Sequence, residues 1–535
     1  AYGIYAKTDI KLKNGIDADI TATANGKTAT DDESNAAEAY ALRGDTSITI
    51  TGNIAGKISA TASGSEDEAK AYALRSDNEA ITIFGRITKA ITAKATSKSS
   101  SADAFGIYAK NAVTLNNGIA ADITATANGK TGASAYAIIG SFFVTITGDI
   151  AGKITATATG NDGGAYTWAL KSYGAISISG KITKAITAKA TSKSSGAEAY
   201  SINASNNVIL NNGIDADLTA TANGKTTASA YVFYSPSSSI EITGDIAGKI
   251  TANATANDNN AYACALYTGT TTISGRITKA ITTKATSKSK VAYAYGIYTN
   301  ADLTLNNGIN ADITTTANGA KSASANTIYA SNLMITGDIA GKITANATSN
   351  DSYAYAYALY SNTGTITISG KITKAITIKA TSKTSKANAY GIYANYGDIT
   401  LGGIAADITA TATSGSEGVA NASGIYAVGN LTIHGDIAGK ITAKGSAGKG
   451  GEVYGIYASS DASIDGDITK TITVTSKGEA TGIHASSMTL NSNLGTISVT
   501  GDGNAYGWAV GVQLTVTSGF LTGKATVTGT TAATG

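Results

Sequence analysis

Short segments of alternating apolar and polar residues recur at a nearly fixed distance along the chain. They are clearest in the motif Ile-Thr-Ala-Thr-Ala and its variants, in which every second residue is apolar. Alternation with a period of two is typical of a β-strand with one buried face. Most steps between leading apolar residues are 30 to 33 residues, as in 123−91 = 32 and 154−123 = 31. The leading residues are Ile20, Ile58, Ile91, Ile123, Ile154, Ile186, Leu218, Ile250, Ile281, Ile313, Ile343, Ile376, Ile408, Ile441 and Ile472, with weaker copies near Ile497 and Ala525.

Two further apolar columns keep the same spacing. One runs through Ile16, Ile54 and Ile87, and the other begins with Leu12 and Ile50. Another predicted strand, Ala-Tyr-Gly-Ile-Tyr-Ala, opens most repeats, and Gly and Asn mark the corners, where they tolerate left-handed backbone conformations. A coil of ~31 residues with three or four short strands cannot bury its inner face alone, so we expect coils to stack in register.

A longer repeat groups the coils in threes. The Ala-Tyr-Gly-Ile-Tyr motif and its variants begin at Ala104, Ala199, Ala294 and Ala389, in steps of 95 residues (199−104 = 95). We therefore predict an all-β fold, an elongated parallel β-helix (β-solenoid) of about 17 coils of roughly 31 residues. Its handedness stays open. The predicted triplets are residues 1–103, 104–198, 199–293, 294–388 and 389–480, followed by degenerate terminal coils at 481–535.

Charged residues follow the same register. Alignment on the Ile column sets Asp122 against Lys153, and a second column five residues before it sets Asp149 against Lys181. Opposite charges on adjacent strands stabilise pairing, and a slip by one coil would bring like charges together. We therefore interpret these aspartates as ladder partners rather than catalytic acids. The same assignment pairs Asp217 with Lys249 and Asp245 with Arg276.

Composition excludes several functional classes. The net charge is +3, too small to suggest a nucleic-acid or membrane-surface partner. The lone cysteine, Cys264, provides neither a disulfide framework nor a cysteine-based zinc site. No apolar run approaches the 18 residues typical of a membrane-spanning helix, so we expect no membrane insertion. No cofactor is expected, with calcium as the one candidate.

The calcium candidate lies in the first triplet, which is eight residues longer than the others (103−95 = 8). Its extra residues are acidic and fall in two loops that connect the same pair of strands. Six carboxylates there could hold Ca²⁺, which favours oxygen ligands, form a solvated edge, or contact a basic partner. The residues are Asp31, Asp32 and Glu33 in the first loop and Glu66, Asp67 and Glu68 in the second.

Further along, the same edge turns basic. Our first interpretation is a solvated face that prevents unwanted lateral sheet association. The alternative is a binding stripe for an acidic glycan or for another subunit. The triplet-spaced lysines of this edge are Lys98, Lys193, Lys288 and Lys383.

Aromatic residues and histidines complete the candidate chemistry. A tyrosine column is interpreted as a stacked ladder at an edge of the core, with carbohydrate stacking as the alternative. His434 and His484 lie in separate coils without a nucleophilic signature beside them, so we expect neither to be catalytic. The tyrosine column comprises Tyr2, Tyr40, Tyr72, Tyr136, Tyr166, Tyr200, Tyr262 and Tyr295.

The repeated Ala-Tyr-Gly-Ile-Tyr-Ala, with its short Ile-Thr strands and Gly corners, resembles the passenger regions of bacterial autotransporter-type surface proteins and related repetitive adhesins. The resemblance covers nearly the whole chain and is compositional. It implies a secreted, rod-shaped β-solenoid located outside the cell or on its surface.

We therefore expect a non-enzymatic extracellular structural protein that self-assembles, as a homopolymer, into a cell-surface fibre, filament or sheath. Neither terminus carries a polar cap, which adds end-to-end strand pairing as an expected contact. The alternative is an adhesin that binds surface glycans or host or neighbouring cells. A glycan-active β-helix enzyme is a minor alternative, because it needs a unique carboxylate cleft that the repeat does not show.

Overall fold

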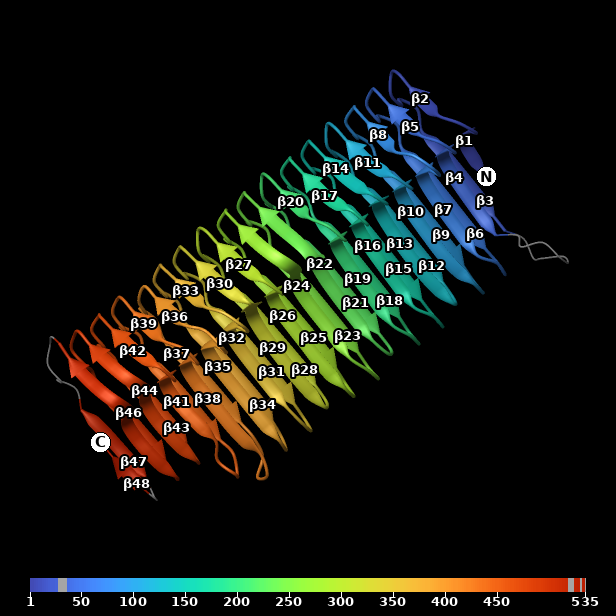
Figure 1. The fold of residues 1–535 in the computed structure, drawn as a ribbon. Helices are drawn as coiled ribbons and strands as arrows, with labels where there is room; N and C mark the ends of the chain where they lie inside the picture. The colour runs from blue at the N-terminus through green and yellow to red at the C-terminus, as the bar shows by residue number, and fades with distance from the viewer. Residues whose placement is uncertain (27–35, 518–523, 530–531, 535) are drawn as a thin grey trace. The chain divides into compact units, whose positions relative to one another are not determined.

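The computed structural model describes residues 1–26, 36–517, 524–529 and 532–534. All regular elements of these described residues are strands, and all their pairings between coils are parallel (Figure 1). The chain divides into an amino-terminal unit, Ala1–Gly269, and a carboxy-terminal unit, Thr270–Gly535. Each unit is a parallel β-solenoid, which confirms the predicted fold.

The amino-terminal unit contains three kinds of strand in each coil, which we call bent, short and Thr strands. The bent strands are β1 (Tyr2–Ala6), β4 (Ala37–Gly44), β7 (Ala69–Ser76), β10 (Ser101–Ala109), β13 (Gly132–Gly140), β16 (Ala165–Ser172), β19 (Ala197–Ala204) and β22 (Ala228–Ile242), which continues through the short-strand position, followed by β24 (Ala261–Ile273), which contains the unit boundary. The short strands are β2 (Ile10–Leu12), β5 (Ile48–Ile50), β8 (Ile81–Ile83), β11 (Ala112–Leu115), β14 (Phe143–Ile146), β17 (Ala175–Ile178) and β20 (Val208–Leu210). The Thr strands are β3 (Ile20–Asn25), β6 (Ile58–Gly64), β9 (Ile91–Ser97), β12 (Ile123–Gly129), β15 (Ile154–Gly160), β18 (Ile186–Ser192), β21 (Leu218–Gly224) and β23 (Ile250–Ala256).

The carboxy-terminal unit repeats the same three kinds. Its bent strands are β26 (Val291–Thr299), β29 (Ser322–Ala330), β32 (Ala354–Ser361), β35 (Lys386–Ala394), β38 (Val419–Ala427), β41 (Glu452–Ala458), β44 (Glu479–Leu490), β46 (Asn504–Val516) and β48 (Ala532–Thr534). Its short strands are β27 (Asp302–Leu305), β30 (Asn332–Ile335), β33 (Ile366–Ile368), β36 (Ile399–Leu401), β39 (Leu431–Ile433) and β42 (Asp461–Ile464). Its Thr strands are β25 (Ile281–Ser287), β28 (Ile313–Gly319), β31 (Ile343–Ser349), β34 (Ile376–Ser382), β37 (Ile408–Thr413), β40 (Ile441–Ser446), β43 (Ile472–Ser476), β45 (Ile497–Gly501) and β47 (Ala525–Gly529).

The predicted apolar columns form the core of each unit. Ile123 pairs with Ile91 and Ile154 in the neighbouring Thr strands, and all three side chains are fully buried. The second column forms single bridges such as Ile54 to Ile87. Between the buried positions, threonines of the Thr strands are half-exposed on the outer face. The period-two pattern therefore identifies the buried face correctly.

Left-handed glycines turn one corner of each triplet. Gly118 and Gly213 have φ of 73° and 77°, and a Cβ on Gly118 would lie 2.4 Å from the carbonyl oxygen of Asp149 in the next coil. Both the positive φ and the close approach of two backbones require glycine here. The Asn-Asn-Gly corners read from the sequence thus have a steric cause.

The bent strands break the simple alternation. In β4, Ala41 and Leu42 are both fully buried, so the alternation shifts by one residue: Tyr40 before them is only 2% exposed, and Arg43 after them is half-exposed. This shift defines two aromatic-rich columns that run from coil to coil. The inner corner column contains Tyr40 and its counterparts, and the outer corner column contains Arg43 and its counterparts.

Tyr166 and Tyr262, which the sequence pattern assigns to the tyrosine column, lie outside it, and that part of the prediction is wrong. Tyr166 pairs with Ser134, whereas Trp168 pairs with Tyr136 of the inner corner column. In β24 the burial pattern gives Cys264 the place that Tyr40 has in β4. Alternation alone could not distinguish two outward positions that are two residues apart.

Candidate functional site

The recurring aspartates hold neighbouring coils together through the backbone. Asp122 Oδ1 accepts a hydrogen bond from the backbone N of Lys153 at 2.8 Å, and Asp149 Oδ1 accepts one from Lys181 N at 2.7 Å. The side-chain ammonium of Lys181 instead pairs with Asp215, at 2.7 Å. The aspartates thus lie beside the predicted lysines, but the lysine charge is not what they bind.

The other predicted ladder positions follow the same geometry within each unit. Asp217 Oδ1 accepts from Lys249 N at 3.0 Å. In the carboxy-terminal unit, the repeat aligns Asp312 with Lys342 in the same way, and Asp312 Oδ1 accepts from Lys342 N at 2.9 Å. Asp245 lies in the amino-terminal unit and Arg276 in the carboxy-terminal unit. A carboxylate that accepts a backbone N–H satisfies a donor that a sharp corner would leave unpaired.

Of the two acidic loops, the structure describes the second. Asp31, Asp32 and Glu33 lie outside the described residues. In the second loop, Glu68 pairs with Lys70 at 2.6 Å and accepts a hydrogen bond from Ser101, while Glu66 is exposed. Among the described residues, no group of three histidine, cysteine, aspartate or glutamate side chains is placed to hold a metal ion.

The basic edge is made of the loops that follow the Thr strands, and its lysines include both paired and unpaired ones. Lys130 pairs with Asp162 at 3.8 Å, and Lys225 pairs with Asp258 at 3.2 Å. The triplet-spaced lysines are exposed and form no ion pair with any described residue. These unpaired lysines are Lys98 and Lys193 in the amino-terminal unit and Lys288 and Lys383 in the carboxy-terminal unit.

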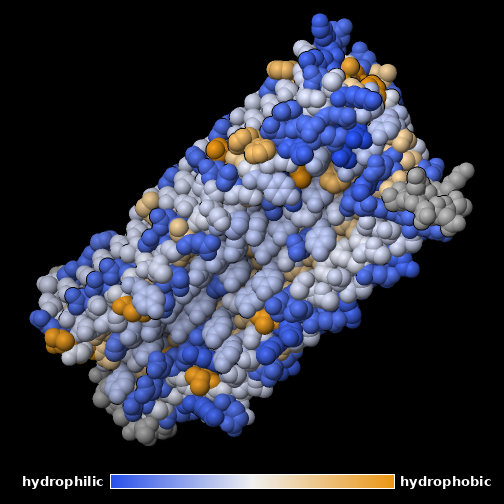
Figure 2. Space-filling view, turned by 45° about the vertical axis from the view of Figure 1, so that its right-hand side comes forward, coloured by the Kyte–Doolittle hydropathy of each residue, from blue (hydrophilic) through white to orange (hydrophobic). Residues whose placement is uncertain are grey.

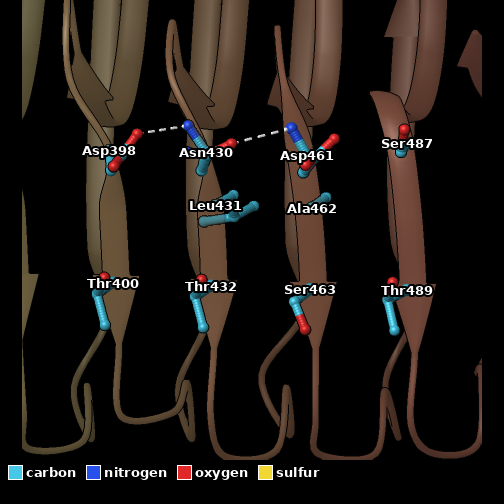
Figure 3. A pocket seen from close by; sticks show the side chains of 10 residues that line it. All are labelled: Asp398, Thr400, Asn430, Leu431, Thr432, Asp461, Ala462, Ser463, Ser487 and Thr489. Atoms are coloured by element: carbon cyan, nitrogen blue, oxygen red, sulfur yellow. Dashed lines mark hydrogen bonds between the residues drawn. The ribbon is translucent and has the colours of Figure 1, made fainter.

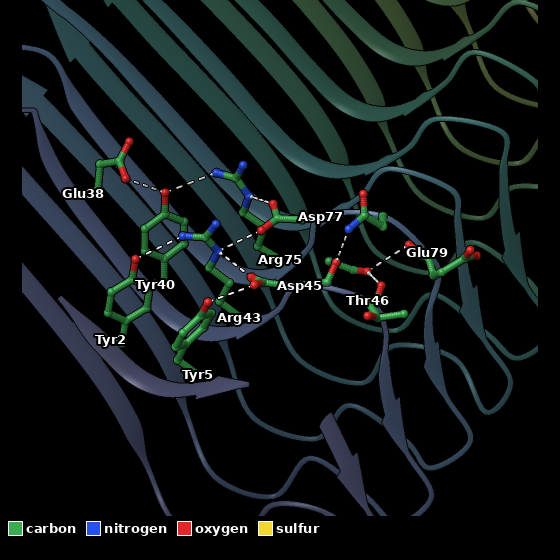
Figure 4. Close-up of polar contacts among 12 residues, drawn as sticks. Tyr2, Tyr5, Glu38, Tyr40, Arg43, Asp45, Thr46, Arg75, Asp77 and Glu79 are labelled. Carbon is green, nitrogen blue, oxygen red and sulfur yellow. Dashed lines mark hydrogen bonds and ion pairs between the residues drawn. The ribbon is translucent and has the colours of Figure 1, made fainter. Parts of the chain in front are cut away.

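Near the amino terminus, arginines interleave with the aromatic columns (Figure 4). The Arg43 guanidinium lies 4.8 Å from the ring centroid of Tyr40, and its Nε lies 2.8 Å from Asp77 Oδ2. Arg75 repeats this arrangement, 4.4 Å from the Tyr72 ring and 2.5 Å from Asp77. Burial and a hydrogen bond to Glu38 raise the pKa of Tyr40. The arginines, aspartates and aromatic rings of this cluster therefore interact with one another rather than with an outside ligand.

The inner corner rings of the amino-terminal unit stack face to face. Tyr72 lies between Tyr40, at 5.1 Å and 6°, and Phe105, at 4.5 Å and 1°. The stack continues to Trp168 and beyond with similar geometry. A sugar stacks on an open aromatic face, and here each face is covered by the next ring. The geometry therefore supports a structural ladder rather than carbohydrate stacking on these rings.

A second candidate site is a polar groove on the short strands of the carboxy-terminal unit, with a volume of about 470 Å³ (Figure 3). Four neighbouring strand segments, β36, β39, β42 and part of β44, contribute its floor and walls. The side chains that line this polar groove are Asp398, Thr400, Asn430, Leu431, Thr432, Asp461, Ala462, Ser463, Ser487 and Thr489.

Two hydrogen bonds fix the groove's first row of side chains. Asp398 Oδ1 accepts from Asn430 N at 2.7 Å, and Asn430 Oδ1 accepts from Asp461 N at 3.2 Å. These are the same inter-coil contacts that Asp122 and its counterparts make at another corner. This site could not be recognised in the sequence, because an Asp or Asn in the turn before a short strand looks like any other polar corner residue of the repeat.

The two histidines have different surroundings. His434 Nδ1 lies 3.0 Å from Asp465 Oδ2, and hydrogen bonds from Asn491 and His434 lower the pKa of Asp465. His484 occupies the outer corner column and stacks on Tyr457 at 4.8 Å and 5°. Burial lowers the pKa of His484 below its ordinary value. Neither contact includes a nucleophile that would make a catalytic pair.

Large hydrophobic side chains are scattered on the face shown in Figure 2, with hydrophilic residues between them. No helix among the described residues is long and apolar enough to cross a membrane.

These features define a repeat protein of the parallel β-solenoid class, in which recurring corner aspartates and stacked rings make contacts between coils. Comparisons with protein-family models, with curated proteins and with solved structures find no match to the chain.

Proposed function

We propose that the chain is a non-enzymatic extracellular structural protein whose copies associate side by side into a cell-surface fibre, filament or sheath. The observation that carries this proposal is the row of unpaired lysines along the basic edge. Lys98 and Lys193 follow β9 and β18, which are three coils apart, and Lys288 and Lys383 repeat this step in the other unit. A charge that recurs once per triplet suits a contact with a partner of the same period, such as another copy.

The distribution of carboxylates supports a role without catalysis. Glycoside hydrolysis needs two carboxylates on opposite sides of one bond, whereas the aspartates that recur at the corners, such as Asp122, Asp217 and Asp312, bind backbone N–H groups of the next coil. Asp103 and Glu68 are two neighbouring carboxylates that do not fit this pattern. Burial raises the pKa of Asp103, and the nearby charge of Glu68 raises it further. Glu68, however, is already bound to Lys70 and Ser101.

The resemblance to autotransporter-type passenger regions supports a location outside the cell. Association through the basic edge requires an acidic surface on the neighbouring copy, for which the exposed Glu66 loop is the best described candidate.

Sedimentation analysis at increasing salt tests the association. We expect oligomers that dissociate as salt rises, because exposed charges are screened within about 10 Å at 0.1 M. Changing the four unpaired lysines to glutamate should abolish the oligomers. The matched control changes four equally spaced, exposed lysines of the Thr strands, and this variant should still associate. The control lysines are Lys94, Lys189, Lys284 and Lys379.

A protein that remains monomeric at high concentration and low salt contradicts the proposal, as does dissociation of both lysine variants alike. The purified protein should also leave acidic and neutral polysaccharides intact. Depolymerisation that is lost in Asp103→Asn or Glu68→Gln would instead identify an enzyme.

A second candidate function is glycan binding by an adhesin, which the polar groove favours for the reasons developed below.

A further inference from the structure

The polar groove presents two parallel rows of hydrogen-bonding side chains. Residues two apart on a strand point to the same face, so Asp398 and Thr400 project together, as do Asn430 and Thr432. We call the rows the acceptor row and the hydroxyl row. The acceptor row is Asp398, Asn430, Asp461 and Ser487, and the hydroxyl row is Thr400, Thr432, Ser463 and Thr489.

No side chain of β39 or β42 projects outward between the two rows. Leu431 and Ala462, which lie between the rows on β39 and β42, are buried beneath the strands, so backbone forms the floor of the groove (Figure 3). A ligand can therefore lie along this floor and reach both rows at once.

Several polar groups of the groove have no hydrogen-bond partner among the described residues. They include the hydroxyls of Thr400 and Thr432 and the carboxylate of Asp461. Hydroxyls donate and accept, and carboxylates only accept. Together they complement a ligand that carries many hydroxyl groups of its own.

The charge of the groove restricts the ligand further. Two carboxylates and no lysine or arginine line it, so it disfavours anions such as phosphate, nucleic acid or acidic glycans. A shared cation does not fit either, because Asp398 and Asp461 are two coil spacings apart, about 9.6 Å. A protein partner would need an apolar or aromatic anchor, and the exposed lining offers none.

We infer that the polar groove binds a neutral linear polysaccharide whose chain runs across the short strands, along the direction in which the coils stack. Equivalent side chains recur about every 4.8 Å in that direction, the spacing of paired strands. An extended polysaccharide presents a similar set of hydroxyls at each sugar unit. Successive sugars can therefore meet successive pairs of acceptor and hydroxyl side chains.

The corresponding face of the amino-terminal unit lacks this combination. There the positions equivalent to the acceptor row include Ala112, Phe143 and Ala175, while the hydroxyl row persists as Thr114 and Thr145. Threonine is a favoured strand residue on any sheet, so the hydroxyl row alone has no functional meaning. Asp9 and Ser47 in the first two coils, and Asn207 and Ser239 in later ones, are polar at the equivalent position, but Ala112, Phe143 and Ala175 interrupt the row between them. An acceptor row that combines with an uninterrupted hydroxyl row over four coils is therefore the feature of the polar groove.

Saturation-transfer NMR on the full chain provides the test, because it detects weak binding. The probes are neutral oligosaccharides of glucose, xylose, mannose and N-acetylglucosamine, with oligogalacturonate as the anionic and spermine as the cationic comparison. We expect at least one neutral probe to bind and the anionic probe not to bind. The signal is measured on soluble protein whether or not copies associate, so its failure leaves the structural proposal intact.

The groove variant is Asp398→Ala with Thr432→Val, for which we expect about tenfold weaker binding of the neutral probe. Its matched control is Asp407→Ala with Thr442→Val, which removes a carboxylate bound to Lys440 N and a Thr-strand hydroxyl outside the groove. The control should bind as the wild type does. Thr432→Val alone, which preserves side-chain shape, covers the case in which the double variant does not fold.

Three results would overturn the inference. They are no binding of any neutral probe, binding of charged probes alone, and neutral binding that survives the groove variant and Thr432→Val unchanged.

Discussion

The two units differ in which corner column is aromatic without interruption. In the amino-terminal unit the inner corner column is aromatic in every coil from Tyr2 to Tyr231. In the carboxy-terminal unit that column is interrupted by Asn326, Ser423 and Thr481. There the outer corner column is aromatic instead, from Tyr298 to His484. Its members are Tyr298, Tyr329, Tyr360, Tyr393, Tyr426, Tyr457 and His484.

The difference shows that the corner needs one continuous column of rings but does not determine which column supplies it. Where Ser423 leaves space in the inner column, the Tyr426 ring approaches Tyr390 at 5.6 Å and Tyr454 at 6.1 Å. Where the inner column is full, the outer one is free to carry cations, such as Lys171 at 4.0 Å from the Trp168 ring. The corner needs a continuous column of rings because protein interiors are closely packed and tolerate few voids.

Removal of an inner ring from the amino-terminal unit should have the largest effect. Tyr72 is only 7% exposed and is stacked on both sides, so Tyr72→Ala leaves a hole in the column. We expect a loss of about 3 kcal/mol in the free energy of unfolding. Chemical denaturation measures it, and Tyr173→Ala, at a site 57% exposed, is the control that should lose little. Equal losses would show that the ladder is not a packing element.

A swap within the carboxy-terminal unit sharpens the comparison. Ser423→Tyr should overpack the corner and Tyr426→Ala should empty it, each at a cost of about 2 kcal/mol. The double variant moves the ring from the outer to the inner column, as in the amino-terminal unit, and should lose less than the sum of the two. A double-mutant cycle measures this coupling. Simple additivity would contradict the idea that the two columns share one space.

The corner aspartates offer a smaller test, shared by both units. Asp122→Ala should lower stability by about 1 kcal/mol, because Lys153 N loses its acceptor. Asp122→Asn keeps an acceptor oxygen and should lose less. Lys153→Met should have almost no effect, since the bond uses the backbone rather than the ammonium group. A larger effect from Lys153→Met than from Asp122→Ala would restore the charge ladder expected from the sequence.

The smallest expected effect is on pH dependence in the outer corner column. Burial lowers the pKa of His484 in the folded state, so its contribution to stability is present above its unfolded pKa and is lost as pH falls through the folded pKa. Wild type should therefore lose more thermal stability between pH 7 and pH 5 than His484→Phe does. Parallel curves for the two proteins would show that His484 does not titrate with folding.

The fold was largely predictable from the sequence, and the sites were not. Ile123 and its counterparts reveal the core, because a strand with one buried face has an apolar residue at every second position. The pattern also places Asp122 beside Lys153, but it cannot reveal that the carboxylate reaches the backbone instead of the ammonium. That choice depends on side-chain rotamers and corner geometry.

The bent strands and the polar groove escape prediction for a related reason. A shift of one residue between Tyr40 and Leu42 reverses the inward and outward sides without changing the composition of the strand. The groove depends on Asp398, Asn430 and Asp461 occupying the same position in three successive coils, beside a row of hydroxyls, and this alignment becomes visible only in the three-dimensional structure.

Diffraction from the associated protein, recorded by electron microscopy of its native material, tests the central claim most directly. If copies associate through lysines that recur every three coils, the pattern should contain the strand spacing of about 4.8 Å and a weaker repeat near 14.4 Å. The longer repeat should disappear at high salt together with the side-by-side assemblies. Isolated single molecules under all conditions, or assemblies with no three-coil repeat, would contradict the account.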